Sequence, residues 1–177
     1  VVIDCDVHQG DGTASIFAGD PSVFTLSIHG RRNYPLRKEQ SDLDVELEDG
    51  TGDRKYLDAL ERALAAVRAA GPFDLAVYLA GADPYAGDRL GRLDLSADGL
   101  AARDRRVVPE RRGVGRPTAV GRGGGYASDE ARIAALHLAT VRAAVEEWCS
   151  TMPKGRDNAG PCGTANSQPA DGTLDSG

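Results

Sequence analysis

Short apolar runs alternate along this chain with longer segments in which apolar residues recur every three or four positions. A short run of β-branched or apolar residues bounded by polar residues predicts a buried strand, and the wider spacing predicts an amphipathic helix. We therefore predict strands at residues 1–3, 23–28, 75–80 and 118–120, with an edge strand or extended loop at 43–47. The predicted helices span residues 13–17, about 54–70, about 96–112 and about 128–149.

The order of these elements predicts the fold class. Strands alternate with helices, which is typical of an α/β protein with a mostly parallel sheet flanked by helices. In such folds, ligands bind beyond the carboxyl ends of the strands. Polar clusters follow three of the predicted strands, at residues 4–11, 81–88 and 123–126. The sequence therefore predicts a functional site where these three strand ends meet.

The two ends of the chain differ from the rest. Val1 already lies in a β-type run, so we expect the domain to include material before it and to be incomplete at its N-terminus. Residues 150–177 contain no aromatic residue and one Leu, and such a segment cannot bury enough apolar surface to order itself. We predict one folded portion at residues 1–149 and a disordered tail at 150–177.

Composition restricts the class of protein. The 177 residues are 41% hydrophobic and 27% charged, as in soluble globular proteins. The net charge of -6 argues against direct binding of nucleic acid or of an anionic membrane. No segment has the length of a membrane span or the pattern of a secretory signal. Three widely spaced cysteines favour a reducing compartment, so we expect a cytoplasmic protein.

Asp4, Asp6 and His8 alternate along the first strand and its extension, so their side chains are expected on one face. Carboxylates and an imidazole at this spacing can bind one divalent cation such as zinc. The alternative is a solvated strand end with a capping Asp. Asp83, just past a buried strand, is the natural third ligand, although an Asp at such a place also caps helices and turns.

Tyr126 follows three glycines, among them Gly124 and Gly125, which permit backbone conformations that direct a side chain into a pocket. A neutral phenol can donate a hydrogen bond to a developing oxyanion. The alternative is a packing Tyr after a glycine-rich turn. A phosphate-binding P-loop is excluded because no Lys-Ser/Thr follows the glycines.

The remaining candidate side chains have simpler interpretations. His29 follows the second strand and is expected near the site, whereas His137 lies on a helix as a packed or surface residue. Cys5 alternates away from the Asp4 and Asp6 face and is expected to be a small buried apolar residue. Asp4-Cys5-Asp6 also matches part of the nucleophile motif of haloacid dehalogenases, but that motif requires Thr or Val where His8 stands.

Together these motifs resemble the zinc-dependent histone deacetylase family, and most closely its class IV branch and bacterial relatives. The resemblance covers almost all of residues 1–149 and depends on four segments in a fixed order. These segments are IDCDVHQGDGT at 3–13, TLSIH at 25–29, GAD at 81–83 with GDRLG at 87–91, and GGGY at 123–126. The resemblance implies an arginase/deacetylase-like α/β fold.

The resemblance also implies residue roles. Asp6, His8 and Asp83 match zinc ligands, Tyr126 matches a transition-state hydrogen-bond donor, and the glycines before it match a substrate loop. Asp4, Asp6 and Ser27 match positions around a structural potassium ion, and Asp4 and Asp11 match carboxylates that orient a pair of neighbouring histidines. The implied reaction is hydrolysis of an acetyl-amide on lysine or on a polyamine, in which a histidine moves the protons.

This chain lacks that histidine pair, which the family carries before the segment matching Val1. We therefore expect little or no deacetylase activity from the chain alone. Gly121 and Arg122 also replace apolar residues before the glycine loop, which would place Tyr126 less firmly. The alternatives left open are a non-catalytic metal-binding remnant and an acetylpolyamine amidohydrolase.

Overall fold

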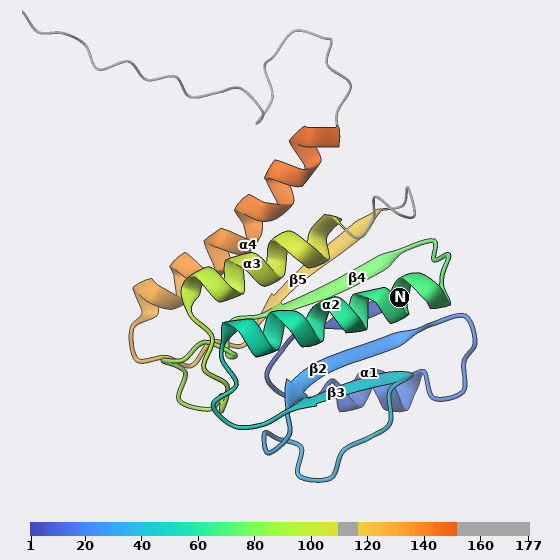
Figure 1. The fold of residues 1–177 in the computed structure, drawn as a ribbon, viewed down its shortest axis with the longest axis horizontal. Helices are drawn as coiled ribbons and strands as arrows, with labels where there is room; N and C mark the ends of the chain where they lie inside the picture. Colours follow the sequence, from blue (N-terminus) through green and yellow to red (C-terminus); the bar gives the residue numbers. More distant parts are fainter. Residues whose placement is uncertain (110–116, 152–177) are drawn as a thin grey trace, which may run out of the picture.

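A parallel five-stranded sheet forms the centre of the chain in the computed structural model, which describes residues 1–109 and 117–151 (Figure 1). The strands are β1 (Val2–Asp4), β2 (Thr25–Gly30), β3 (Leu43–Leu47), β4 (Ala76–Gly81) and β5 (Thr118–Gly123). The helices of the described residues are α1 (Asp11–Ile16), α2 (Asp53–Ala70), α3 (Ala97–Val107) and α4 (Glu130–Thr151). The predicted alternation of strands and helices is confirmed.

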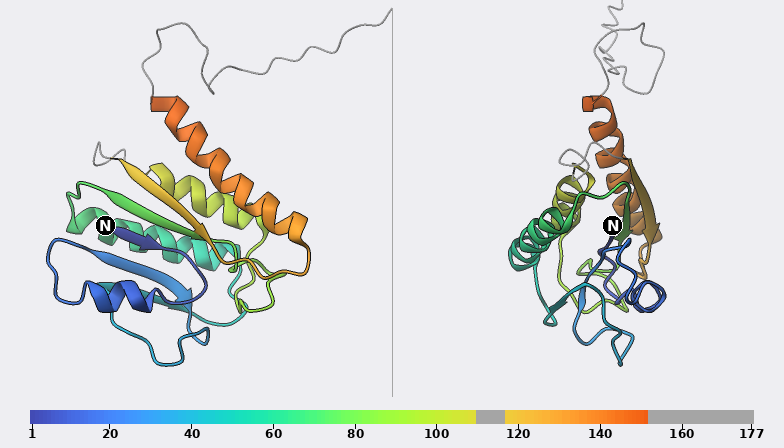
Figure 2. Two further views of the ribbon diagram at one scale, coloured as in Figure 1. Left: turned by 180° about the vertical axis from the view of Figure 1, so that it is seen from behind. Right: turned by 90° about the vertical axis from the view of Figure 1, so that its right-hand side faces the viewer.

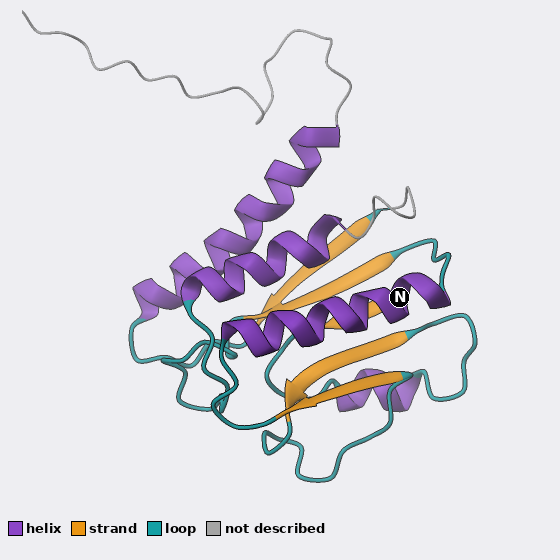
Figure 3. Cartoon of the chain, in the orientation of Figure 1, coloured by secondary structure: helices purple, strands orange, loops and turns teal. Residues whose placement is uncertain are grey.

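The strand order β3-β2-β1-β4-β5 places β1 in the middle of the sheet, and every neighbouring pair is parallel. Asp4 is in register with Ser27 on one side and with Leu79 on the other. All five strands therefore end at the same edge of the sheet (Figure 3). This edge receives the polar segments that follow β1, β4 and β5.

Helices cover the two faces of the sheet unequally. Helices α2 and α3 lie on one face, α4 packs against α3, and the short α1 lies on the opposite face beside β2 (Figure 2). The apolar stripe of α2 buries Leu60, Leu64 and Val67 against the sheet. The face of β1, β4 and β5 opposite α3 carries the half-buried side chains of Val77 and Leu79.

Several predicted boundaries need correction. Ser96 caps α3 as predicted, its Oγ accepting a hydrogen bond from the Gly99 N–H at 2.9 Å. The α-helix ends at Val107, and the end predicted near residue 112 lies outside the described residues. Strand β5 continues to Gly123, three residues past the prediction, because β4 supplies backbone partners along its whole length. Helix α4 runs to Thr151, and the rest of the predicted tail, 152–177, lies outside the described residues.

The α2 core contact gives a test of the fold. Leu64→Ala should lower the free energy of unfolding by about 2–5 kcal/mol, because Leu64 is fully buried and its loss leaves a cavity. The matched control is Leu36→Ala, at a side chain that is 92% exposed, which should change stability by less than about 0.5 kcal/mol. Urea denaturation measures both, and equal effects would contradict the position of α2.

No helix in the described part of the chain combines the length and the apolar character that a bilayer crossing requires.

Candidate metal centre

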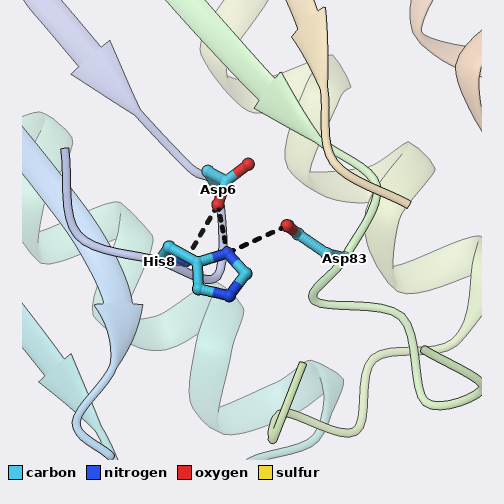
Figure 4. A group of neighbouring side chains, drawn as sticks. All are labelled: Asp6, His8 and Asp83. Carbon is cyan, nitrogen blue, oxygen red and sulfur yellow. Dashed lines mark hydrogen bonds and ion pairs between the residues drawn. The ribbon is translucent and has the colours of Figure 1, made fainter. Parts of the chain in front are cut away.

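The carboxyl ends of β1 and β4 bring three side chains together. Asp6 and His8 lie on the segment that follows β1, and Asp83 lies two residues past the end of β4 (Figure 4). Because β1 and β4 are parallel neighbours, these segments leave the sheet side by side. One ligand atom from each of the three residues lies within 4.8 Å of the others. The sequence prediction that these residues converge agrees with this geometry.

Short contacts fix the arrangement. His8 Nδ1 lies 3.0 Å from Asp6 Oδ1 and 3.2 Å from Asp83 Oδ2. The Asp83 Oδ1 atom accepts a hydrogen bond of 2.9 Å from the Val7 N–H, and the Asp6 Oδ1 atom accepts one of 2.9 Å from the His8 N–H. The backbone N–H of Val7, between Asp6 and His8, therefore holds the Asp83 carboxylate in place.

The cluster fits a cation on its own chemistry. A single His8 Nδ1 carries at most one hydrogen, so it cannot donate properly to two carboxylates. Asp83 is fully buried, and its Oδ2 accepts no hydrogen bond from the described residues. The contact of this oxygen with His8 Nδ1 at 3.2 Å is an ion pair and not a hydrogen bond. A buried carboxylate oxygen without a hydrogen bond is costly, and a divalent cation between these three atoms would remove that cost.

The pKa values of Asp6 and His8 are both raised by their surroundings. Burial raises the pKa of Asp6 to about 6, and repulsion by the Asp83 carboxylate adds to the rise. The Asp83 carboxylate is the main cause that raises the pKa of His8 to about 9. A bound cation would compete with protons for these three side chains.

Asp4 belongs to the same pocket. It is 6% exposed, its Oδ1 accepts a hydrogen bond of 2.9 Å from the Asp6 N–H, and burial raises its pKa to about 7. The pocket measures about 200 Å³. Its lining consists of Asp4, Asp6, His8, Gln9, Gly10, Leu79, Gly81, Arg122 and Gly123. Strand β1 ends at Asp4, so Asp6 and His8 lie beyond the strand. The three side chains were predicted to lie on one face of a strand; they instead line one pocket.

The pocket lies on the face of the sheet opposite α3. Tyr78 faces α3, since its hydroxyl donates to Asp104 at 2.6 Å, and Leu79 therefore faces the other way. Asp4, in register with Leu79, shares that face. The side of the sheet that helices cover least is thus the side on which the pocket lies.

Ser27 lies beside Asp4 in the sheet, and its Oγ is 2.9 Å from His29 Nδ1. His29 is fully buried, and burial lowers the pKa of its ring. Asp11 begins α1, where its Oδ1 accepts a hydrogen bond from the Gly12 N–H at 2.9 Å. In the described part of the chain, Asp11 and His29 do not line the pocket.

The glycine loop after β5 packs directly on Asp83. Gly124 has a φ of +62°, and a Cβ atom at this position would lie 2.4 Å from Asp83 Oδ2. Gly125 has a φ of +98°, and a Cβ there would lie 2.9 Å from a methyl carbon of Ile133. Both positions require glycine for conformation and for space.

Tyr126 is placed through its backbone. Its N–H donates to the Asp88 carboxylate, and its carbonyl accepts a hydrogen bond of 2.6 Å from Arg89 Nε. Its side chain is 41% exposed and is not among the described residues that line the pocket. Sequence reasoning missed the role of Asp88, which holds two turns together. Besides the Tyr126 N–H, its carboxylate accepts the Leu90 and Gly91 N–H groups, both at 2.8 Å through Oδ1. The turn-forming pattern Gly-Asp-Arg-Leu-Gly was the available signal.

Comparison with known proteins gives the family. Residues 1–142 match the histone deacetylase domain. The chain is 43% identical over 144 residues to an uncharacterised protein of Picosynechococcus sp., covering 81% of this chain and 48% of that protein. It is 33% identical over 138 residues to histone deacetylase 2 of Arabidopsis thaliana, covering 76% of this chain and 36% of the relative.

Solved structures share the fold. The acetylpolyamine aminohydrolase of Burkholderia pseudomallei matches with a TM-score of 0.66 at 24% identity, over 83% of this chain and 44% of that one. The HD domain of HDA15 matches with a TM-score of 0.64 at 25% identity, over 81% and 44% of the two chains. The chain thus spans about half or less of the length of these proteins. Over the part that it does span, the chain belongs to the histone deacetylase family.

Proposed function

We propose that this chain supplies the metal-binding part of an active site that hydrolyses acetyl-amides, with Asp6, His8 and Asp83 as ligands of a zinc ion. The observation that carries the proposal is the buried Asp83 Oδ2, which has no hydrogen-bond partner among the described residues and faces His8 beside Asp6. Two carboxylates and one imidazole leave further positions open for water and substrate, as in hydrolytic zinc sites.

Zinc in such a site polarises an acyl carbonyl and activates water. The chain's own residues orient the site: the Val7 N–H holds Asp83, and the Asp6 N–H is held by Asp4. In this proposal the Tyr126 phenol donates a hydrogen bond to the carbonyl oxygen as negative charge develops on it. Gly124 and Gly125 form the loop that carries this phenol to the substrate.

We also propose that Asp4, Asp6 and Ser27 surround a structural potassium ion. The register of Asp4 with Ser27 and the burial of both side chains support this assignment. Oxygen ligands from carboxylates, hydroxyls and backbone carbonyls suit a hard monovalent cation. Such an ion would also compensate part of the charge of Asp4 and Asp6.

The chain does not contain the neighbouring histidines that move protons in the family, so we propose that residues 1–149 are the C-terminal portion of a deacetylase domain. Asp4 and Asp11 would then orient histidines from another portion of that domain. Support comes from the pocket, which lies on the sheet face with the least helical cover. Alone, the chain would bind zinc and turn over little or no substrate.

Acetylated lysine is the proposed substrate, and acetylated polyamines are the alternative. The first rests on the relative named histone deacetylase 2 and the second on the structural neighbour named acetylpolyamine aminohydrolase. A cytoplasmic location remains part of the proposal, from the sequence alone.

A chimera tests this proposal. The portion of the Picosynechococcus relative that precedes its match to this chain is joined to Val1, and the chimera and the chain alone are loaded with zinc. We expect both to bind one zinc ion per chain, and only the chimera to hydrolyse an acetyl-lysine peptide, because general acid-base catalysis contributes about 10²–10⁴-fold.

Metal analysis and release of free amine measure the two outcomes. Zinc binding without turnover in the chimera would support the alternative of a non-catalytic metal-binding remnant. Faster turnover of an acetylpolyamine than of the peptide would assign the other substrate. Turnover by the chain alone at the rate of the chimera would contradict the assignment of the proton carrier.

A further inference from the structure

A buried guanidinium lies behind the candidate metal centre. Arg103 on α3 is 1% exposed, and its Nη1 atom donates to two backbone carbonyls, that of Cys5 at 3.2 Å and that of Gly81 at 2.7 Å. Cys5 immediately precedes Asp6, and Gly81 lies two residues before Asp83. We propose that Arg103 is a positioning residue that sets the distance between the two acidic ligands. This inference rests on the proposed metal site.

The carbonyls of Cys5 and Gly81 lie just past the last residues that pair in register between β1 and β4. Asp4 and Leu79 are the last pair in register between β1 and β4, and the Cys5 N–H donates to the Leu79 carbonyl at 3.0 Å. A Cβ atom on Gly81 would lie 2.5 Å from the Asp6 Cα atom, so the two backbones touch here. The Nη1 atom of Arg103, which donates to both carbonyls, therefore links the segment that carries Asp6 to the segment that carries Asp83.

A second set of contacts holds the guanidinium itself. Asp104 Oδ1 accepts a hydrogen bond from Arg103 Nε at 2.9 Å and forms an ion pair with Nη2, also at 2.9 Å. The Tyr78 hydroxyl donates to the same oxygen at 2.6 Å, and Thr140 Oγ1 donates to Asp104 Oδ2 at 2.6 Å. Strand β4 and helix α4 thus fix Asp104, Asp104 fixes two nitrogens of Arg103, and the third nitrogen is directed at the carbonyls.

The chemistry of the pair favours positioning over simple stabilisation. A buried ion pair often stabilises a fold no better than apolar residues of similar volume, because both charges lose their hydration. The planar guanidinium, however, offers several donors in a fixed geometry, which neither an apolar side chain nor a Lys ammonium provides. Its positive charge also lies behind two carboxylates that must approach each other closely.

Removal of the whole pair provides the test. In Arg103→Met/Asp104→Leu, no unpaired buried charge remains, so the fold is retained while the carbonyls of Cys5 and Gly81 lose their donor. The matched control is Thr25→Val, which also removes a buried hydroxyl that donates to a carboxylate, that of Asp42 at 2.9 Å, but has no part in the contacts of Arg103. Arg103→Met alone is the third variant.

Cobalt(II) serves as the probe, because its visible spectrum reports on ligand geometry. We measure its affinity by competition with a chelator, its spectrum in each variant, and the urea stability of the metal-free proteins. We expect the double variant to bind Co²⁺ at least about tenfold more weakly and with an altered spectrum, in the range seen for residues behind metal ligands. Thr25→Val should stay within about twofold, with the spectrum of the wild type.

The outcomes separate this inference from the proposed function. Wild-type affinity and spectrum in the double variant would overturn the role of Arg103 and leave the metal site intact. Equal weakening in Thr25→Val would also overturn it, since general loss of stability would then explain the effect. Failure of the wild-type chain to bind Co²⁺ would overturn the metal site itself, and the positioning role with it.

Discussion

Replacement of Asp83 by Asn is expected to lower zinc affinity at least about 100-fold, or about 2.7 kcal/mol, because loss of even a residue behind a metal ligand costs about 10–100-fold. Asp83 is the fully buried member of the cluster, and Asn matches its shape. The amide oxygen can still accept the Val7 N–H, so the loop after β4 keeps its anchor. The amide nitrogen, however, carries no charge and turns a donor toward the site of the ion.

The control for this variant is Asp53→Asn at the start of α2. Asp53 Oδ1 also accepts a backbone N–H from a distant segment, that of Ser96 at 2.8 Å, but Asp53 does not belong to the cluster. This variant should bind zinc like the wild type. Chelator competition measures both affinities, and wild-type binding by Asp83→Asn would show that zinc binds elsewhere or not at all.

The elements that sequence predicts best are those with strong periodicity and clear ends. Helix α2 begins and ends within one residue of its prediction, since its leucines repeat at helical spacing and Gly71-Pro72 stops it. The convergence of Asp6, His8 and Asp83 was predictable for a related reason: parallel neighbouring strands bring their carboxyl ends to one edge. The segments involved are short, which leaves little freedom in where the side chains lie.

Strand β5 shows where side-chain patterns fail. Gly121 and Arg122 favour a loop, but the ladder with β4 continues through both residues to Gly123. Backbone hydrogen bonds form regardless of side-chain type, so an available neighbour extends a strand that its own sequence does not favour. The position of Tyr126 was beyond prediction because it depends on two glycines with positive φ and on the carboxylate of Asp88.

The interior of α3 shows a second limit. Leu100 and Val107 indicate its buried face, and Arg103 and Asp104 fall on that same face at helical spacing. Charged residues are rarely fully buried without partners, so sequence reasoning assigns such a pair to solvent. The partners Tyr78 and Thr140 come from β4 and α4, far away in the chain, and only the tertiary structure shows that the pair is satisfied.

Replacement of Gly124 by Ala is the second change with a large expected effect. The φ of +62° makes any side chain strained here, at about 1–3 kcal/mol, and the new Cβ would lie 2.4 Å from Asp83 Oδ2. Asp83 cannot move away freely, because the Val7 N–H holds its other oxygen. We therefore expect both lower stability and zinc affinity reduced at least about tenfold, as for other changes beside metal ligands.

Two neighbouring glycines separate these causes. Gly123→Ala meets no atom within 4 Å and has no positive φ, so stability and zinc binding should both stay near the wild type. Gly125→Ala, at a φ of +98° and against Ile133, should lose stability with little change in zinc affinity, because it does not touch Asp83. Urea denaturation of the metal-free proteins and chelator competition measure the three variants.

If Gly125→Ala weakens zinc binding as much as Gly124→Ala, backbone strain in the loop is the cause and contact with Asp83 is not. If Gly124→Ala alone weakens it, contact between the glycine loop and Asp83 is the cause, and the loop that precedes Tyr126 and the proposed ligand act as one unit.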